Sequence, residues 1–213
     1  MFSGYNLPER LMMRLIALGS AALLGLAACS QPLPEEPASA PAPGPATPSQ
    51  PTGDPVSAGD KLTAQGFGPL RIGMTRAEVE AALGPDANPN AVGGPDPEAC
   101  DMFRPNRAPE GMLVMLENGV LTSVWVSRNA AVETDRALNV GDTAAEVKRV
   151  YGASAEATPH KYVDAPAEYI TVWTGSDHTS AAARGLKYEI GTDGKVSSIA
   201  AGGPSIQYVE GCA

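Results

Sequence analysis

Two stretches of the chain alternate apolar and polar residues with the period of a β-strand, and each is interrupted by an Asx-Gly pair. The pairs are Asn118-Gly119 and Asp193-Gly194, and such pairs between two strands favour hairpins with two-residue turns. One further apolar segment precedes each hairpin and predicts a third strand. In chain order the predicted strands are residues 100–104, 112–117 and 120–127, then residues 168–174, 186–192 and 195–201.

A short amphipathic helix is predicted ahead of each set of strands. Thr75 and Thr143 stand at N-cap positions, and Glu78 and Glu146 follow three residues later. In a capping box of this T-x-x-E form, the glutamate accepts the amide of its own cap residue. We therefore interpret both glutamates as helix caps and not as catalytic acids.

The two helix-and-strand segments resemble each other. Residues 70–79 and 138–147 share the pattern L-x-[IV]-G-x-T-x-A-E-V, and the hairpin segments 119–124 and 194–199 also match. Chance similarity between Ala-rich helices would explain one match, whereas two matches in the same order favour an internal duplication. The predicted fold class is α+β, with two tandem repeats that each pack short helices on an antiparallel meander of three to four strands.

Pairing each hairpin around a two-residue turn assigns its side chains to two faces. The second hairpin then has an ordinary core face, with Leu186, Tyr188, Ile190 and Ile199, and a wet face with Lys187, Glu189 and Val196. The first hairpin is apolar on both faces. Its predicted core face holds Leu113, Met115, Val124 and Val126, and its second face holds Met112, Val114, Leu116, Leu121 and Trp125.

This second apolar face has two interpretations. Either the second repeat or the tail at residues 206–209 covers it, or it is a patch that binds a partner. In the second case Trp125 is the anchor, because tryptophan is enriched among the residues that dominate binding energy at interfaces.

The N-terminal segment predicts a lipid anchor. Arg14 precedes an apolar stretch, residues 15–26, which is too short to span a bilayer and is followed by the lipobox Leu26-Ala27-Ala28-Cys29. Cys29 would carry the acyl chains, palmitate among them, and more than one chain holds a protein firmly on a membrane. A plain secretory signal and an uncleaved anchor are the alternatives. Ser30 in place of an Asp after the cysteine favours the periplasmic face of the outer membrane.

Only Cys100 and Cys212 remain once Cys29 is assigned to lipid. In an oxidising compartment an isolated pair of cysteines forms a disulfide, which here would tie down the C-terminus. Ahead of the predicted folded region lies a proline-rich segment with few large apolar residues, which predicts a disordered tether. The resulting organisation is a signal peptide (1–28), a lipidated cysteine and tether (29–60), a first repeat (61–130) and a second repeat (131–213).

Composition excludes several classes of function. The formal net charge is −9, without a basic cluster, which disfavours nucleic acid as a partner. The two histidines have no metal-ligand spacing, and no cofactor fingerprint is present. Ser176-Asp177-His178 holds the residue types of a catalytic triad, but adjacency in sequence does not supply the geometry. We expect no enzymatic activity, no metal and no cofactor.

The motif around Gly73-Met74-Thr75 and Gly141-Asp142-Thr143 resembles the SmpA/OmlA (BamE-like) family of small outer-membrane lipoproteins. It also resembles the tandem repeats of the β-lactamase inhibitory protein (BLIP). The first resemblance implies an outer-membrane protein-binding module that acts in envelope or outer-membrane protein assembly and maintenance. The second implies an inhibitor or sensor that binds a periplasmic enzyme through its sheet face. Either partner would be an envelope protein whose identity the sequence does not give.

Overall fold

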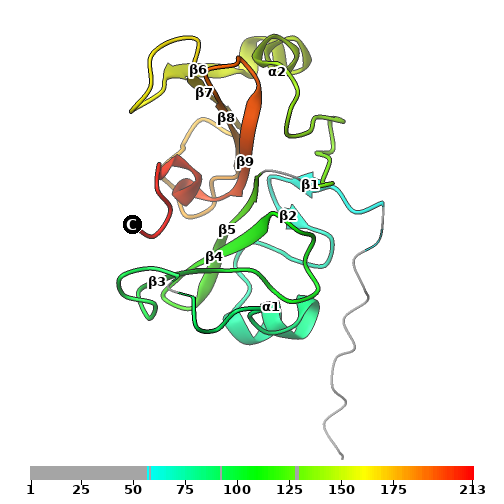
Figure 1. Cartoon of the computed structure of the whole chain (residues 1–213), viewed down its shortest axis with the longest axis vertical. Helices are drawn as coiled ribbons and strands as arrows, with labels where there is room; N and C mark the ends of the chain where they lie inside the picture. The colour runs from blue at the N-terminus through cyan, green and yellow to red at the C-terminus, as the bar shows by residue number, and fades with distance from the viewer. Residues whose placement is uncertain (1–56, 58, 92, 128–129) are drawn as a thin grey trace, which may run out of the picture. The chain divides into compact units, whose positions relative to one another are not determined.

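The structure of the chain is a computed structural model that describes residues 57, 59–91, 93–127 and 130–213. Its main element is a seven-stranded antiparallel sheet with the strand order β3-β4-β5-β9-β8-β7-β6, accompanied by two helices and a two-stranded sheet (Figure 1). The predicted α+β class is therefore confirmed. The elements are β1 (Leu62–Thr63), β2 (Gly66–Phe67), α1 (Arg76–Leu83), β3 (Cys100–Phe103), β4 (Met112–Glu117), β5 (Val120–Ser127), α2 (Ala144–Tyr151), η1 (Gly152–Ser154), β6 (Glu156–Pro159), β7 (Glu168–Trp173), β8 (Gly185–Ile190), β9 (Val196–Gly202) and η2 (Pro204–Gln207).

The large sheet consists of two meanders that join at their last strands. Strands β3, β4 and β5 are neighbours in chain order, as are β6, β7, β8 and β9, and β5 pairs antiparallel with β9. Three strands of the second meander lie where the apolar pattern predicted strands. The pattern did not predict β6, because all four of its residues are exposed and it shows no alternation of apolar and polar positions. It also missed β1 and β2, which at two residues each are too short to show a period.

A β-bulge in the first hairpin reverses the predicted faces of β5. The turn at Asn118-Gly119 has two residues, as predicted, and Glu117 pairs with Val120. Beyond it the register shifts, so that Met115 pairs with Ser123 and Thr122 is the extra residue. A one-residue shift moves every later side chain of the strand to the opposite face. Val124 and Val126 therefore share a face with Met112 and Val114, and not with Leu113 and Met115.

The second hairpin contains a matching bulge at Ser197, between the pairs Ile190↔Val196 and Glu189↔Ser198. Its loop is one residue longer than predicted, because Gly191 N donates to Lys195 O across the three residues 192–194. The extra loop residue and the bulge shift the strand register in opposite directions. From the pair Glu189↔Ser198 onward the register is therefore the predicted one, and the predicted faces of Tyr188 and Ile199 are correct. Val196, which precedes the bulge, lies on the core face and not on the wet face.

The two bulges make the same side-chain contact. The hydroxyl of Thr122 donates to Met115 O at 3.4 Å, and the hydroxyl of Ser197 donates to Glu189 O at 3.1 Å. In each bulge, the extra residue thus forms a side-chain hydrogen bond to the backbone of the partner strand.

The glycine of each L-x-[IV]-G-x-T motif is bonded to its hairpin in the same way. Gly73 N donates to Leu121 O and Gly141 N donates to Val196 O, both at 2.8 Å. In return, Leu121 N donates to Met74 O at 2.7 Å and Val196 N donates to Asp142 O at 2.8 Å. The motif therefore connects each helix to the last strand of its own meander.

The two helices begin at the predicted threonines but are capped differently. Thr75 accepts from Glu78 N, while the Glu78 carboxylate accepts from Thr75 N at 2.8 Å, which makes the full capping box. Thr143 accepts from Glu146 N at 3.2 Å, but the Glu146 carboxylate pairs with Arg149 at 3.2 Å. The prediction of a second capping box is therefore wrong. The physical reason is local, because Arg149 competes for the carboxylate and the corresponding residue of α1 is Ala81.

Both helices pack on the same face of the sheet, where the main core lies. Val79 and Leu83 of α1 and Val147 of α2 are fully buried in one cluster with the inward residues of β4, β5, β8 and β9. Among the described residues, no helix is long and apolar enough to cross a membrane. The opposite face of the sheet, which we call the open face, carries no helix of the described chain except the short η2.

Candidate functional site

Four of the five residues proposed to bind a partner lie in the core. They are at most 1% exposed and lie on the face of the sheet that the helices cover: Met112, Val114, Leu116 and Leu121. The bulge at Thr122 is the cause, because it places Val124 and Val126 on the same face as these four residues. Of the five proposed residues, Trp125 alone lies on the open face. The apolar patch predicted from the sequence is thus corrected to a core face, and Trp125 is separated from the residues that were grouped with it.

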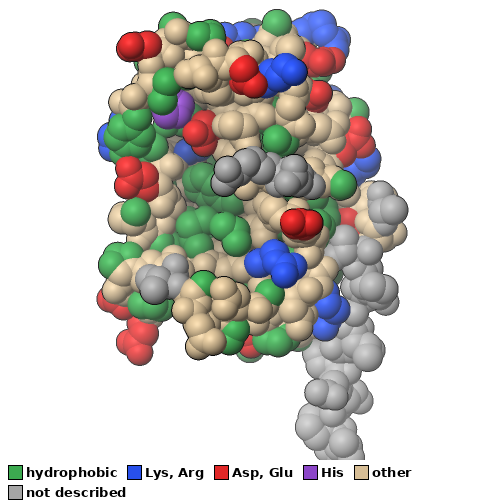
Figure 2. Space-filling view, viewed as in Figure 1, with side chains coloured by type: hydrophobic (Ala, Val, Ile, Leu, Met, Phe, Trp, Pro, Cys, Tyr) green, Lys and Arg blue, Asp and Glu red, His purple; other side chains and the backbone are tan. Residues whose placement is uncertain are grey.

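The open face is organised in rows of side chains that run across the strands. The central row crosses six strands through successive pairs, and the row beside it has Glu189 and Tyr169 among its members. The central row is Leu113, Trp125, Ala200, Lys187, Thr171 and Glu156. Hydrophobic side chains line a hollow at the centre of the view in Figure 2, where β4 and β5 lie in Figure 1.

The C-terminal tail covers the row on one side of this central row. Ile206 of η2 is fully buried, and a side chain at Gly185 would contact it at 3.1 Å. Gly211 lies against the sulfur of Met102 at the other end of the same row. The tail therefore covers a different face from the one predicted, because Met112, Val114, Leu116 and Leu121 lie on the side of the sheet that the helices cover. Leu113 remains 37% exposed in the central row.

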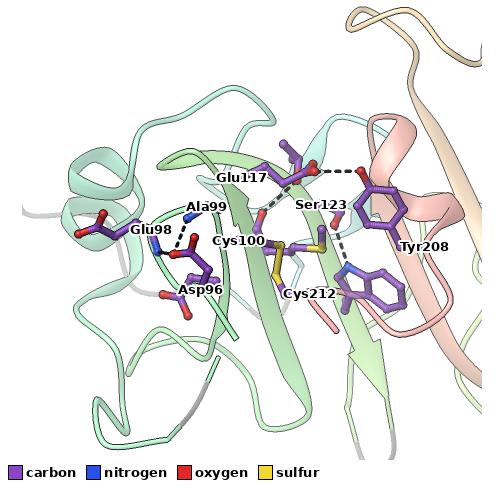
Figure 3. The surroundings of a disulfide bond; sticks show 12 residues. Asp96, Glu98, Ala99, Cys100, Glu117, Ser123, Tyr208 and Cys212 are labelled. Atoms are coloured by element: carbon purple, nitrogen blue, oxygen red, sulfur yellow. Dashed lines mark hydrogen bonds between the residues drawn. A yellow bond between two sulfur atoms is a disulfide. The ribbon is translucent and has the colours of Figure 1, made fainter. Parts of the chain in front are cut away.

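The predicted disulfide between Cys100 and Cys212 is present, with a Cα–Cα distance of 5.4 Å (Figure 3). A second contact holds the tail nearby, since the Tyr208 hydroxyl donates to Glu117 Oε1 at 3.0 Å. The tail is thus fixed to β3 by a covalent bond and to β4 by a hydrogen bond. Cys29, the predicted lipidation site, lies outside the described residues.

Trp125 lies at the point where the two meanders meet. It pairs with Ala200, which is its own counterpart when the hairpin segments 119–124 and 194–199 are aligned and extended. The indole Nε1 donates to Ser123 Oγ at 2.7 Å, and the ring is half-buried. Because alanine occupies the opposing position, the large ring has room over the junction of the two meanders.

Lys187 lies between two aromatic rings on this face. Its ammonium is 5.1 Å from the ring centroid of Trp125 and 5.2 Å from that of Tyr169, and it donates to Tyr208 O. The residue is 5% exposed, and burial lowers the pKa of its ammonium to about 8. The sequence assigned Lys187 to the correct face, but a lysine in a polar alternation gives no signal that it will be buried.

Polar groups form a second cluster beside Lys187. The Glu189 carboxylate accepts from Ser198 Oγ at 2.8 Å and contacts His160 Nε2 at 3.2 Å. His160 also stacks on Tyr169 with a centroid distance of 4.6 Å. His160 lies in the β6–β7 loop, and no pattern in the sequence predicted that it would contact Glu189 of β8. The two rows thus combine aromatic rings with hydrogen-bonded polar groups.

The Ser176-Asp177-His178 segment is a turn in this structure. The Asp177 carboxylate accepts from Thr179 Oγ1 at 2.8 Å and from Thr179 N and Ser180 N, both at 3.1 Å, and these bonds, the hydroxyl's above all, lower the pKa of the carboxyl. The His178 ring stacks on Trp173, and its Nε2 contacts Gly175 O at 3.0 Å. These bonds occupy the aspartate and histidine within the turn itself. Within the described part of the chain, no three His, Cys, Asp or Glu side chains are grouped as metal ligands.

Comparison of the chain with protein-family models, with curated proteins and with solved structures finds no match.

Proposed function

We propose that the chain is a lipid-anchored protein of the bacterial envelope that binds a protein partner through the open face of its sheet. The observation that carries this proposal is the central row of that face. There the half-buried ring of Trp125 lies beside Leu113, which is 37% exposed, while the tail covers the neighbouring row. A tryptophan flanked by apolar surface and bonded polar groups is the composition of an interface hot spot.

The proposed address and anchor rest on the sequence. The apolar stretch 15–26 and the lipobox ending at Cys29 support lipidation, and Ser30 supports the periplasmic face of the outer membrane. The anchor is tested by mass spectrometry of the N-terminal peptide, in which the Cys29→Ser protein should lack acyl chains and leave the membrane fraction. Recovery of that variant in the membrane fraction would argue against a lipid anchor.

We further propose that the domain is an internal duplication of the BamE/BLIP-like type. The matched hydrogen bonds of Gly73 and Gly141, and the matched bulges at Thr122 and Ser197, support a duplication. A role in envelope or outer-membrane protein assembly and maintenance follows from the resemblance to the SmpA/OmlA family.

The binding role is tested with Trp125→Ala in the full chain. We expect capture of the partner from detergent-solubilised membranes to fall at least about tenfold per folded molecule, because a hot-spot truncation costs 2 kcal/mol or more. The melting temperature should also fall somewhat, because the hydrogen bond to Ser123 and the contact with Lys187 are lost, so capture is compared per folded molecule. Leu116→Ala is the matched control: it removes a fully buried core side chain, so it should lower the melting temperature and leave capture per folded molecule unchanged.

The opposite pattern, a large loss of stability in Trp125→Ala with unchanged capture, would show that the ring is structural. A photo-crosslinking amino acid at Leu113 identifies the partner directly, because this exposed side chain is next to Trp125. Recovery of β-barrel assembly subunits supports the assembly role.

The alternative is an inhibitor or sensor of a periplasmic enzyme. It is favoured by the continuity of the open face, on which one row of side chains crosses both meanders without a break. In the same crosslinking experiment, this alternative predicts capture of a hydrolase whose activity falls as the protein is added.

A further inference from the structure

A cavity of about 220 Å³ lies on the open face over β6, β7 and β8, in the upper part of Figure 1. Thr171 of β7 is at its centre, and strand register places a larger side chain on each side of this threonine. These four side chains are Glu156, Lys187, Tyr169 and Trp173. Paired residues and alternate residues of a strand project from the same face of a sheet, so all of them stand around the cavity. We propose that the cavity binds a primary ammonium group, R–NH₃⁺, through acceptors that its wall leaves unused.

His178, on the rim of the cavity, has one acceptor to offer. Its Nε2 lies 3.0 Å from Gly175 O, and because a carbonyl oxygen only accepts, this nitrogen carries the proton of the neutral ring. The other ring nitrogen, Nδ1, then holds a lone pair. It faces Glu156 Oε2 at 3.9 Å. Two acceptors thus face each other, and no donor of the described chain lies between them.

The gap between these two acceptors has the width that an ammonium nitrogen requires. Hydrogen bonds from nitrogen are about 2.9 Å long, and one nitrogen can lie at that distance from both atoms at once. The Glu156 carboxylate accepts no hydrogen bond within the described chain, and its side chain is 56% exposed, so a ligand can reach it. A charged donor between the two acceptors would form the stronger, charge-assisted kind of hydrogen bond.

Gln207, on the opposite rim, adds a third acceptor. Its Nε2 donates to His178 O at 3.4 Å and to Pro204 O at 3.3 Å, and these two carbonyls determine which end of the amide is the nitrogen. The amide oxygen is therefore the end with capacity left. A primary ammonium has three donors and no acceptor, which matches three acceptors on the wall. A carboxylate ligand would add acceptors where donors are needed.

The ammonium of Lys187 does not reverse this pattern. It lies between Tyr169 and Trp125, of which the second is not on the cavity wall, and it donates to Tyr208 O. The residue is 5% exposed, and the nearby Glu189 carboxylate attracts its charge. Glu156 is therefore the carboxylate of the cavity that has no opposite charge bonded to it, which favours a cationic ligand.

The test is an NMR titration of the purified full chain with n-butylamine, followed through the amide signals of Thr171 and His178. We expect saturable shifts of these signals. Binding should be weaker by at least about tenfold for n-butanol, which lacks the charge, and for n-butyltrimethylammonium, which lacks the donors. Equal affinity for either analogue would overturn the proposal.

The capped peptide acetyl-Gly-Lys-Gly-amide separates the two sources of such a group. Tighter binding of this peptide than of n-butylamine would assign the cavity to a lysine side chain of a protein, and equal or weaker binding would assign it to a free amine. Absence of shifts with both probes would overturn the proposal. Because the experiment contains no protein partner, its failure would leave the binding role proposed for Trp125 unaffected.

Two variants test the named acceptors. Glu156→Gln should weaken n-butylamine binding by at least about tenfold with an unchanged melting temperature, because an exposed charged acceptor becomes neutral. Glu168→Gln is the matched control on the same hairpin, since its carboxylate pairs with Lys148 away from the cavity, and it should leave binding unchanged. His178→Phe keeps a ring to stack on Trp173 but lacks Nδ1, so it should weaken binding by about fivefold. Wild-type affinity in Glu156→Gln or in His178→Phe would overturn the proposal.

Discussion

At the scale of single residues, Lys187 shows how the open face balances charge and burial. The ammonium lies between Trp125 and Tyr169 and donates to a tail carbonyl, so it has contacts that favour its charged form. Burial acts in the opposite direction and dominates, because the pKa falls to about 8. The residue therefore contributes positive charge to the open face at neutral pH at some cost in stability.

This cost predicts a pH dependence of stability. Between the folded pKa of about 8 and the ordinary value of 10.5, the unfolded chain holds more protons at this lysine than the folded chain. The free energy of unfolding should therefore rise with pH in this window, by roughly 1–2 kcal/mol between pH 7.5 and 9.5. Lys187→Met, which keeps the length of the side chain, should lose this rise. Denaturant unfolding at several pH values measures it, and an equal rise in both proteins would assign the effect to another group.

At the scale of elements, the two helices form a matched pair that differs in one contact. Both begin at a threonine cap, but only Glu78 returns a hydrogen bond to its cap residue. The bonds from Thr75 lower the pKa of the Glu78 carboxyl, because they stabilise its charged form. Glu146 instead bonds to Arg149 on the helix surface, an exposed pair that contributes little.

The matched pair predicts unequal effects of the same substitution. Glu78→Ala should lower the melting temperature at neutral pH more than Glu146→Ala does, because only the first removes a capping contact. The difference should shrink as the pH falls through the lowered pKa of Glu78, since the protonated carboxyl is a weaker acceptor. Thermal unfolding of both variants at pH 7 and at pH 3 measures this. Equal losses at pH 7 would mean that the capping box adds no stability.

At the scale of the whole molecule, the C-terminal tail joins the two halves across the open face. It leaves β9, crosses as η2, and ends at the disulfide with β3 on the far edge of the first meander. Two hydrogen bonds of Tyr208 hold it on the way, one through its hydroxyl to Glu117 and one through its carbonyl to Lys187.

Loss of the disulfide should therefore loosen the tail and lower stability together. A cross-link between residues 112 positions apart contributes about 4–5 kcal/mol in the chain-entropy model. The Cys100→Ala/Cys212→Ala protein should melt at a much lower temperature. Its tryptophan fluorescence should be quenched more by acrylamide, because both tryptophans lie on the face that the tail partly covers. An unchanged melting temperature would mean that other contacts suffice to hold the tail.

The features that the sequence predicted correctly are those set by neighbours along the chain. The strands β4 and β5, the turn at Asn118-Gly119 and the caps at Thr75 and Thr143 follow from local periodicity and turn chemistry. The pairing of Cys100 with Cys212 followed from the number of cysteines. Each depends on a few adjacent residues or on composition, which a single sequence contains.

The features that the sequence did not predict are set by contacts between strands. Thr122 is the extra residue of a bulge, and its hydroxyl donates across the hairpin to Met115 O. The resulting shift in register groups Val124 and Val126 with Met112 and Val114 in the core, on the face that the sequence left open as either covered or partner-binding. The alternation of apolar and polar residues does not indicate the bulge, because the first hairpin has apolar residues on both faces whether its strands pair with the bulge or without it.

By itself, then, the sequence determined the two helices, six of the nine strands of the described chain and the pairing of the cysteines, because propensity, capping and turn geometry act over a few residues. Only the tertiary structure decided which face of the sheet is open, that Trp125 meets Ala200 at the junction, and that Lys187 is buried there. Those outcomes depend on strand register and on the path of the tail, which are fixed when distant segments pack together.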